Sequence, residues 1–150
     1  MELDFSNETL EKLLLKKALS DKNWLNILLK LYDKRWFKDH CIGPTIKNIL
    51  AFYDKYGSIP SIKTVHALTK KFVEKHPDSE VTVPLVQQLL TEVTNLNLNL
   101  PEDVLNANLK EYIRRNAFYN SLYDNAELLE RSPDNYEKVV DKCLENFDKV

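Results

Sequence analysis

Apolar residues recur every three or four positions along most of this chain, which is the spacing of one face of an α-helix. Five such segments precede residue 96, with expected bounds of 6–19, 21–32, 43–57, 61–75 and 83–95. Polar residues that favour helix N-caps stand where four of them begin, namely Ser6 or Asn7, Ser20, Ser61 and Thr82. The pattern therefore predicts a globular head of about five short helices.

Two connecting segments interrupt this periodicity. The segment Asp33–His40 holds Trp36 and Phe37 among basic residues. The segment Leu96–Leu100 alternates apolar and polar residues, which is typical of a strand, but no second strand is expected to pair with it. We therefore predict that Leu96–Leu100 is an extended linker.

The last third of the chain predicts two longer helical arms. Residues 101–131 contain no internal Pro or Gly and would form a helix roughly 45 Å long at 1.5 Å per residue. Ser132 and Pro133 then end this helix and begin a shorter one, as N-cap and first helical residue. The expected fold is all-α, one structural domain with a head over residues 1–100 and a projecting two-helix hairpin over 101–150.

The apolar residues of the two arms are too widely spread for a helix hairpin to bury alone, because each helix offers one inner seam. The head can cover the base of the hairpin as far as Ile113, but the tip is expected to project beyond it. We therefore predict that the tip pairs with a second copy of the chain in a four-helix bundle. The expected interface residues are Phe118, Leu122, Tyr123, Ala126, Tyr136, Val140, Cys143 and Phe147.

Composition favours a soluble protein of the cytosol. Hydrophobic residues make up 43% and charged residues 29%, and the net charge of -2 gives no general attraction to nucleic acid or to an anionic membrane. No apolar run approaches the length of a membrane-spanning helix, and the acidic start, Met1–Asp4, does not resemble a signal peptide. Cys41 and Cys143 are expected to be free thiols in a reducing compartment.

The sequence offers no familiar catalytic motif. Its two glycines, Gly43 and Gly57, cannot supply a phosphate-binding loop or a dinucleotide fingerprint. The three histidines do not have zinc-protease spacing, and the carboxylates are scattered singly along helix faces. We therefore predict a chain that is not an enzyme and that has no catalytic residue, metal or cofactor of its own.

Two segments leave nucleic-acid binding open. The segment Lys34–Lys38 could contact single strands by charge and stacking, although Trp36 and Phe37 could equally anchor the connector. The third and fourth helices outline a helix-turn-helix, but the acidic balance argues against duplex binding. The residues expected to face outward on the fourth helix are Lys63, Thr64, His66 and Lys70.

The order of these features resembles the N-terminal domain of DnaB-type replicative DNA helicases, most closely those of T-even-like phages. The likeness lies in the segment Phe37–His40, which leads into the third helix, in the turn Gly57–Ser61, and in Tyr112–Phe118 on the long helix. It extends roughly from Leu10 to Phe147 and is specific in order and spacing more than in identity.

The resemblance implies a collar domain in a hexameric ring around single-stranded DNA, which the collar meets only indirectly. The hairpins of neighbouring subunits would pair, and the domain would dock primase and in some cases the helicase loader. ATP and Mg²⁺ would belong to a motor domain that is absent from these residues. Arg114, Arg115 and Tyr119 are candidates for docking a partner, and a salt bridge within the head is the alternative for the two arginines.

Two other interpretations stay open. The chain could be a stand-alone adaptor, such as a helicase loader or inhibitor that mimics the collar. It could also be a helix-turn-helix DNA-binding protein. Under the helicase resemblance, the missing motor segment implies either a truncated helicase or a stand-alone relative of one.

Overall fold

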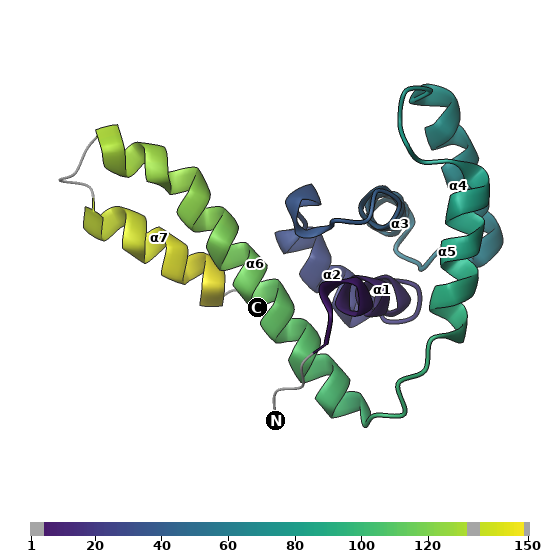
Figure 1. Ribbon diagram of the computed structural model, residues 1–150, viewed down its shortest axis with the longest axis horizontal. Coiled ribbons are helices and arrows are strands. Elements are labelled where there is room, and N and C mark those ends of the chain that lie inside the picture. Colours follow the sequence, from purple (N-terminus) through teal and green to yellow (C-terminus); the bar gives the residue numbers. More distant parts are fainter. Residues whose placement is uncertain (1–4, 132–135, 149–150) are drawn as a thin grey trace. The chain divides into compact units, whose positions relative to one another are not determined.

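The computed structural model describes residues 5–131 and 136–148 and is helical throughout its regular parts (Figure 1). No strand occurs within those residues, which confirms the all-α prediction. The chain divides into two compact units, one over Asp4–Asn99 and the other including Leu100–Val150. Each unit is described separately below.

The first unit contains five α-helices and a short 3₁₀-helix. Their bounds are α1 (Asn7–Ala18), α2 (Lys22–Leu31), η1 (Lys34–Trp36), α3 (Ile42–Tyr56), α4 (Ile62–Lys75) and α5 (Val83–Asn95). Helix α1 packs against α2, α3 and α5, while α4 packs against α3 and α5. The large side chains buried most completely are those of Glu11 and of nine aliphatic residues: Leu14, Leu15, Leu25, Leu28, Ile42, Ile46, Ile49, Val65 and Leu90.

Local capping explains where these helices begin. Three predicted caps are confirmed because their side chains accept a backbone hydrogen bond, namely Ser6, Ser61 and Thr82. The prediction for α2 was wrong by one residue. The Asp21 carboxylate accepts the hydrogen bond from the Asn23 amide at 2.9 Å, whereas the Ser20 hydroxyl donates to the Lys16 carbonyl at 2.9 Å. An aspartate following a serine takes the cap because the serine hydroxyl is bound to the preceding helix.

The connector between α2 and α3 is anchored by an aromatic residue. Trp36 is only 3% exposed, which confirms it as an anchor. Phe37 lies over Tyr32 with ring centroids 6.0 Å apart. Arg35 is held by Asp33, with Nη2 and Oδ2 2.6 Å apart. Trp36 is therefore part of the interior and offers no open face for stacking on a base.

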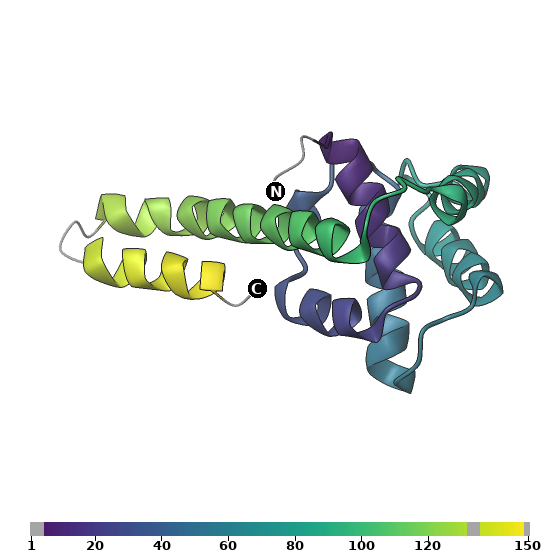
Figure 2. The same cartoon turned by 90° about the horizontal axis from the view of Figure 1, so that it is seen from below.

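The second unit consists of α6 (Glu102–Arg131) and α7 (Tyr136–Asp148). Helix α7 lies alongside the C-terminal half of α6 and runs in the opposite direction (Figure 2). The predicted turn residues Ser132 and Pro133 lie outside the described residues. The segment Leu96–Leu100, which precedes α6, forms neither helix nor strand, as predicted.

Candidate self-association surface

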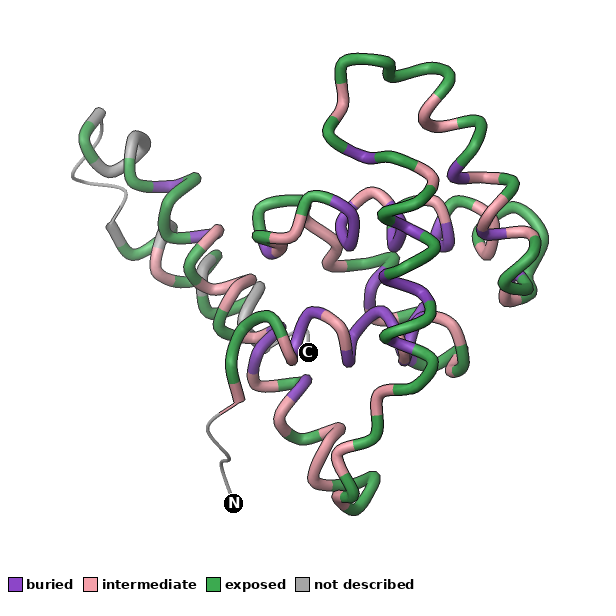
Figure 3. Tube along the Cα trace, turned by 45° about the vertical axis from the view of Figure 1, so that its right-hand side comes forward, coloured by how far each residue is buried: buried purple, intermediate pink, exposed green. Residues whose placement is uncertain are grey.

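Helix α6 buries two different faces along its length (Figure 3). In its N-terminal half the buried residues are Leu109, Tyr112 and Ile113. In its C-terminal half, among the side chains that the structure describes, they are Ser121 and Asn125. With 3.6 residues per turn, the two sets point in directions roughly 150° apart around the helix axis. The face that is buried at the start of α6 is therefore not the face that is buried near its end.

The C-terminal half of α6 buries polar residues. Ser121 is 4% exposed and Asn125 is 6% exposed. Both belong to the C-terminal half of α6, and α7 runs alongside that half. The Asn125 amide donates a 2.7 Å hydrogen bond to the carbonyl of Ser121, so its burial does not leave that donor unpaired. Ser121 and Asn125 bury little apolar surface, so hydrophobic burial contributes little to the α6–α7 pair at these two positions.

Large apolar side chains lie instead on the outer face of the same stretch. Tyr119, Leu122 and Tyr123 are 59%, 41% and 79% exposed. Ala126 is exposed as well, and these four residues fall within an arc of about 100° on the helix. Leu144 on α7 is 48% exposed. Single exposed apolar residues are common on protein surfaces, but a contiguous group marks an interaction site.

The exposed face continues a buried one at coiled-coil spacing. The series alternates steps of three and four residues through Leu109, Tyr112, Asn116, Tyr119, Tyr123 and Ala126. Leu109 and Tyr112 are buried, Asn116 is half-buried, and the last three members are exposed. Such a series is the seam along which helices pair. We call Tyr119, Leu122, Tyr123 and Ala126 the outer face of α6.

The structure places the sequence-predicted interface residues unevenly. Leu122, Tyr123 and Ala126 are exposed together on the outer face, whereas Phe118 and Val140 are half-buried. The predicted residues of α7 whose side chains lie outside the described part of the structure are Tyr136, Cys143 and Phe147. Sequence reasoning missed the buried polar pair Ser121 and Asn125, although its i, i+4 spacing was visible.

The three predicted docking residues also differ from one another. Tyr119 lies on the outer face of α6 and belongs to the exposed apolar group. Arg115 is exposed four positions earlier, on the same side of the helix, while Arg114 is half-buried. An arginine at the edge of an apolar face is a common feature of protein interfaces. Arg115 therefore borders the same surface that Tyr119 helps to form.

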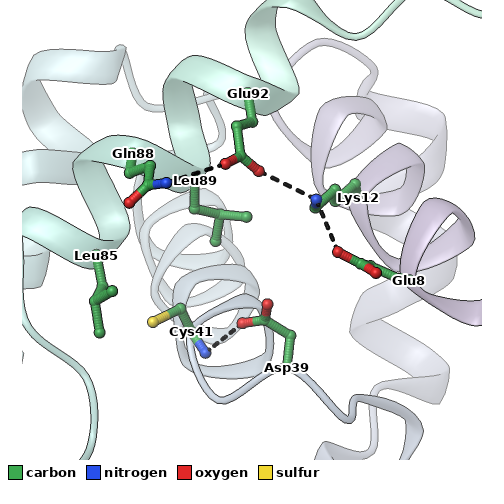
Figure 4. Close-up of a pocket in the computed structure, with 8 residues that line it drawn as sticks. All are labelled: Glu8, Lys12, Asp39, Cys41, Leu85, Gln88, Leu89 and Glu92. Carbon is green, nitrogen blue, oxygen red and sulfur yellow. Dashed lines mark hydrogen bonds and ion pairs between the residues drawn. The ribbon is translucent and has the colours of Figure 1, made fainter.

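A cavity of about 270 Å³ in the first unit is bridged by ion pairs (Figure 4). The Lys12 ammonium lies 3.1 Å from a carboxylate oxygen of Glu8 and 3.1 Å from one of Glu92. The hydrogen bonds that the Lys12 ammonium donates to Glu92, and then to Glu8, raise the pKa of Lys12. Cys41 also lines the cavity, and its burial, followed by the charge of Asp39, raises the pKa of the thiol. A thiol with a raised pKa is a poor nucleophile, which argues against a reactive cysteine here. The ion pair between Lys12 and Glu92 joins α1 to α5 across the cavity.

Within residues 5–131 and 136–148, no cluster of three or more His, Cys, Asp or Glu side chains is placed to hold a metal ion. Among the same residues, no helix combines the length and the apolar character needed to cross a bilayer.

Comparison with known proteins adds no relative: no family model, no curated protein and no solved structure matches this chain.

Proposed function

We propose that this chain is the N-terminal collar domain of a hexameric replicative DNA helicase. Its α6–α7 pair joins it to a second copy, and its surface docks primase. The observation that carries the proposal is the outer face of α6, where Tyr119, Leu122 and Tyr123 are exposed together. The order and spacing of the sequence segments that resemble DnaB-type helicases support the same assignment. ATP and Mg²⁺ belong to the motor domain of such a helicase and not to these helices.

The size of the exposed group determines how strong the pairing should be. Tyr119, Leu122, Tyr123 and Leu144 are each about half exposed or more, so burying each would contribute about 1 kcal/mol. When two copies meet about a two-fold axis, each copy buries its own four residues, so the eight side chains together contribute about 8 kcal/mol. Association itself costs about 4–15 kcal/mol. Isolated domains should therefore pair weakly, and a ring would strengthen the pairing because neighbouring subunits are already close.

Asn116 fits this mode of pairing. It occupies one position of the helical seam and is half-buried, and its amide donates a 2.9 Å hydrogen bond to the Tyr112 carbonyl. A polar residue at one seam position of a coiled coil favours a single register and number of strands, at a cost in stability. Asn116 would act in this way between two copies of α6.

Introducing negative charges into the proposed interface tests the pairing. Leu122→Asp combined with Val140→Asp places carboxylates where apolar side chains should meet, so self-association should be lost. Sedimentation at tens of micromolar measures the distribution of oligomers. Leu122→Asp alone should also weaken association, and because Leu122 is exposed this change should leave the fold intact.

Ala107→Asp is the matched control, since it adds one negative charge at an exposed position in the N-terminal half of α6. It should leave the oligomer distribution of the wild type unchanged. An unchanged distribution in the Leu122→Asp, Val140→Asp double variant would reject the interface.

Primase docking is tested separately. Arg115→Glu reverses an exposed charge beside Tyr119 and should weaken binding of the cognate primase in a titration. Lys110→Glu reverses an exposed charge elsewhere on α6 and serves as its control. Equal affinity of the wild type and the Arg115→Glu variant would place the docking surface elsewhere.

A further inference from the structure

A second surface feature, in the first unit, combines positive charge with aromatic rings. It is a cavity of about 350 Å³ between α3 and α4. Lys47 of α3 and Lys71 and Lys75 of α4 line it, and all three residues are exposed. The nearby carboxylates of the two helices, Asp54 and Glu74, are not among its lining residues. In a chain with a net charge of -2, this is a local concentration of positive charge suited to an anion.

Two aromatic rings and two aliphatic side chains also line the cavity. Phe72 and His76 line it together, and their rings are stacked with centroids 4.3 Å apart and planes inclined by 23°. The His76 ring is held in place because its Nδ1 lies 3.0 Å from the Phe72 carbonyl oxygen. Leu68 and Ala51 add aliphatic surface. A ligand for this site should therefore carry an aromatic or apolar group as well as negative charge.

We propose that the cavity between α3 and α4 binds single-stranded nucleic acid. Phosphate groups would contact Lys47, Lys71 and Lys75, and a base would lie against the Phe72 ring. A cavity of about 350 Å³ is at the small end for ligand sites, which suits one nucleotide at a time. Asn48 also lines the cavity, and its amide can both donate to and accept from a base edge.

Two other anions fit the cavity less well. An acidic polypeptide satisfies the lysines, but its carboxylate side chains provide no planar ring for Phe72. A duplex keeps its bases stacked inside the double helix, so a base could not lie against the Phe72 ring. The connector at Lys34–Lys38, which has a similar composition, has its Trp36 buried and does not offer that ring. All residues of this cavity belong to the unit Asp4–Asn99, so binding there is independent of the pairing proposed for α6 and α7.

The test measures binding of a fluorescent oligothymidylate of about 15 nucleotides to the full chain by anisotropy. Lys71→Glu with Lys75→Glu should weaken binding at least about tenfold, because two of three phosphate contacts are reversed. Lys63→Glu with Lys70→Glu makes the same change of charge on the same helix, outside the cavity, and should change affinity by less than about threefold. The logarithm of affinity should fall with the logarithm of salt with a slope of about -2 for three contacts.

A second set of probes separates base recognition from charge. An abasic strand of the same length carries the same phosphates and should bind several-fold more weakly than the oligothymidylate if stacking contributes. Equal binding of the abasic strand, of a duplex or of a polyglutamate peptide would overturn the proposal, as would equal losses in the two lysine pairs.

Repeating the measurement in the Leu122→Asp background keeps the test separate from self-association. Loss of pairing with unchanged DNA affinity is the expected result. Unchanged pairing with unchanged DNA affinity would reject only the interface. Loss of DNA affinity in that background, with both lysine pairs intact, would overturn the assignment of the cavity.

Discussion

The first unit and the C-terminal half of α6 bury different kinds of side chain. The first unit buries aliphatic side chains such as Leu25 and Ile46, and the Glu11 carboxylate buried with them accepts a hydrogen bond from the Lys38 amide. The C-terminal half of α6 buries Ser121 and Asn125 and exposes Tyr119, Leu122 and Tyr123. The first unit therefore has a complete core within one chain, whereas the apolar surface of the second unit is suited to cover by another molecule.

This difference predicts different responses to protein concentration. A substitution in the core of the first unit should change the free energy of unfolding equally at all concentrations. A substitution on the outer face of α6 should act through association, so its effect should grow with concentration.

The largest effect is expected from Leu25→Ala in α2. Leu25 is fully buried, so its truncation should cost about 2–5 kcal/mol of unfolding free energy through lost burial and the cavity left behind. Leu29 lies one turn later on the same helix and is 41% exposed, so Leu29→Ala should cost less than about 1 kcal/mol. Urea unfolding at two protein concentrations measures both. A concentration-dependent loss for Leu25→Ala would mean that the first unit also relies on a partner.

The buried carboxylate of Glu11 should give the second largest effect. Glu11 is 2% exposed and accepts a hydrogen bond from the backbone amide of Lys38. Glu11→Leu leaves that amide without its acceptor and should cost about 1–3 kcal/mol. Glu11→Gln keeps an acceptor oxygen and should be much less disruptive. Thermal unfolding of the two variants at neutral pH separates the hydrogen bond from the charge.

The same residue gives a pH dependence with a defined sign. Burial raises the pKa of Glu11 in the folded state above 4.5, the Lys38 amide opposes this shift, and the Asp39 charge adds to it. The folded state therefore binds this proton more tightly than the unfolded state does. The stability that this proton gives is full below the unfolded pKa and is lost as pH rises through the folded pKa. Glu11→Gln should flatten this part of the stability profile, and an unchanged slope would contradict the assignment.

Local signals made much of the first unit predictable from the sequence. The caps Ser6, Ser61 and Thr82 act on their own helices, so no tertiary information was needed to find them. Asp21 took the place predicted for Ser20 because the Ser20 hydroxyl bonds to the end of α1. Whether Ser20 or Asp21 becomes the N-cap depends on how the turn between α1 and α2 folds, and the spacing of residues in the sequence does not determine this.

The candidate sites were less predictable because they depend on tertiary contacts. The buried face of α6 changes direction between Ile113 and Ser121, and a single apolar stripe could not show that change. The cavity between α3 and α4 joins Lys47 to Lys71 across two helices. The linear basic cluster at Lys34–Lys38 was easier to find in the sequence, but its Trp36 proved to be buried.

A smaller effect is expected at the end of α3. Gly57 has a φ of 70°, in the left-handed region, and no atom lies near the position of an added Cβ. Gly57→Ala should therefore cost about 1–2 kcal/mol from backbone strain alone. Gly43 lies inside α3, where an added Cβ would meet Phe37 at an ordinary 3.5 Å, so Gly43→Ala should be nearly neutral. Chemical denaturation measures both, and equal costs would contradict a conformational origin.

The smallest effect would sharpen the comparison most directly. Asn125→Leu places an apolar side chain on the buried polar face formed by Ser121 and Asn125. It removes the side-chain hydrogen bond to the Ser121 carbonyl, which still accepts the backbone amide hydrogen bond of the helix. We expect this variant to stabilise the second unit by about 0.5–1 kcal/mol, measured by amide hydrogen exchange in α6 below the concentration of self-association. Ala126→Leu adds apolar volume one position later, on the exposed face, and should give no such gain without a partner. If Ala126→Leu protected α6 and Asn125→Leu did not, the inner and outer faces of this helix would have to be exchanged, and the surface proposed for pairing would be the one that holds α7.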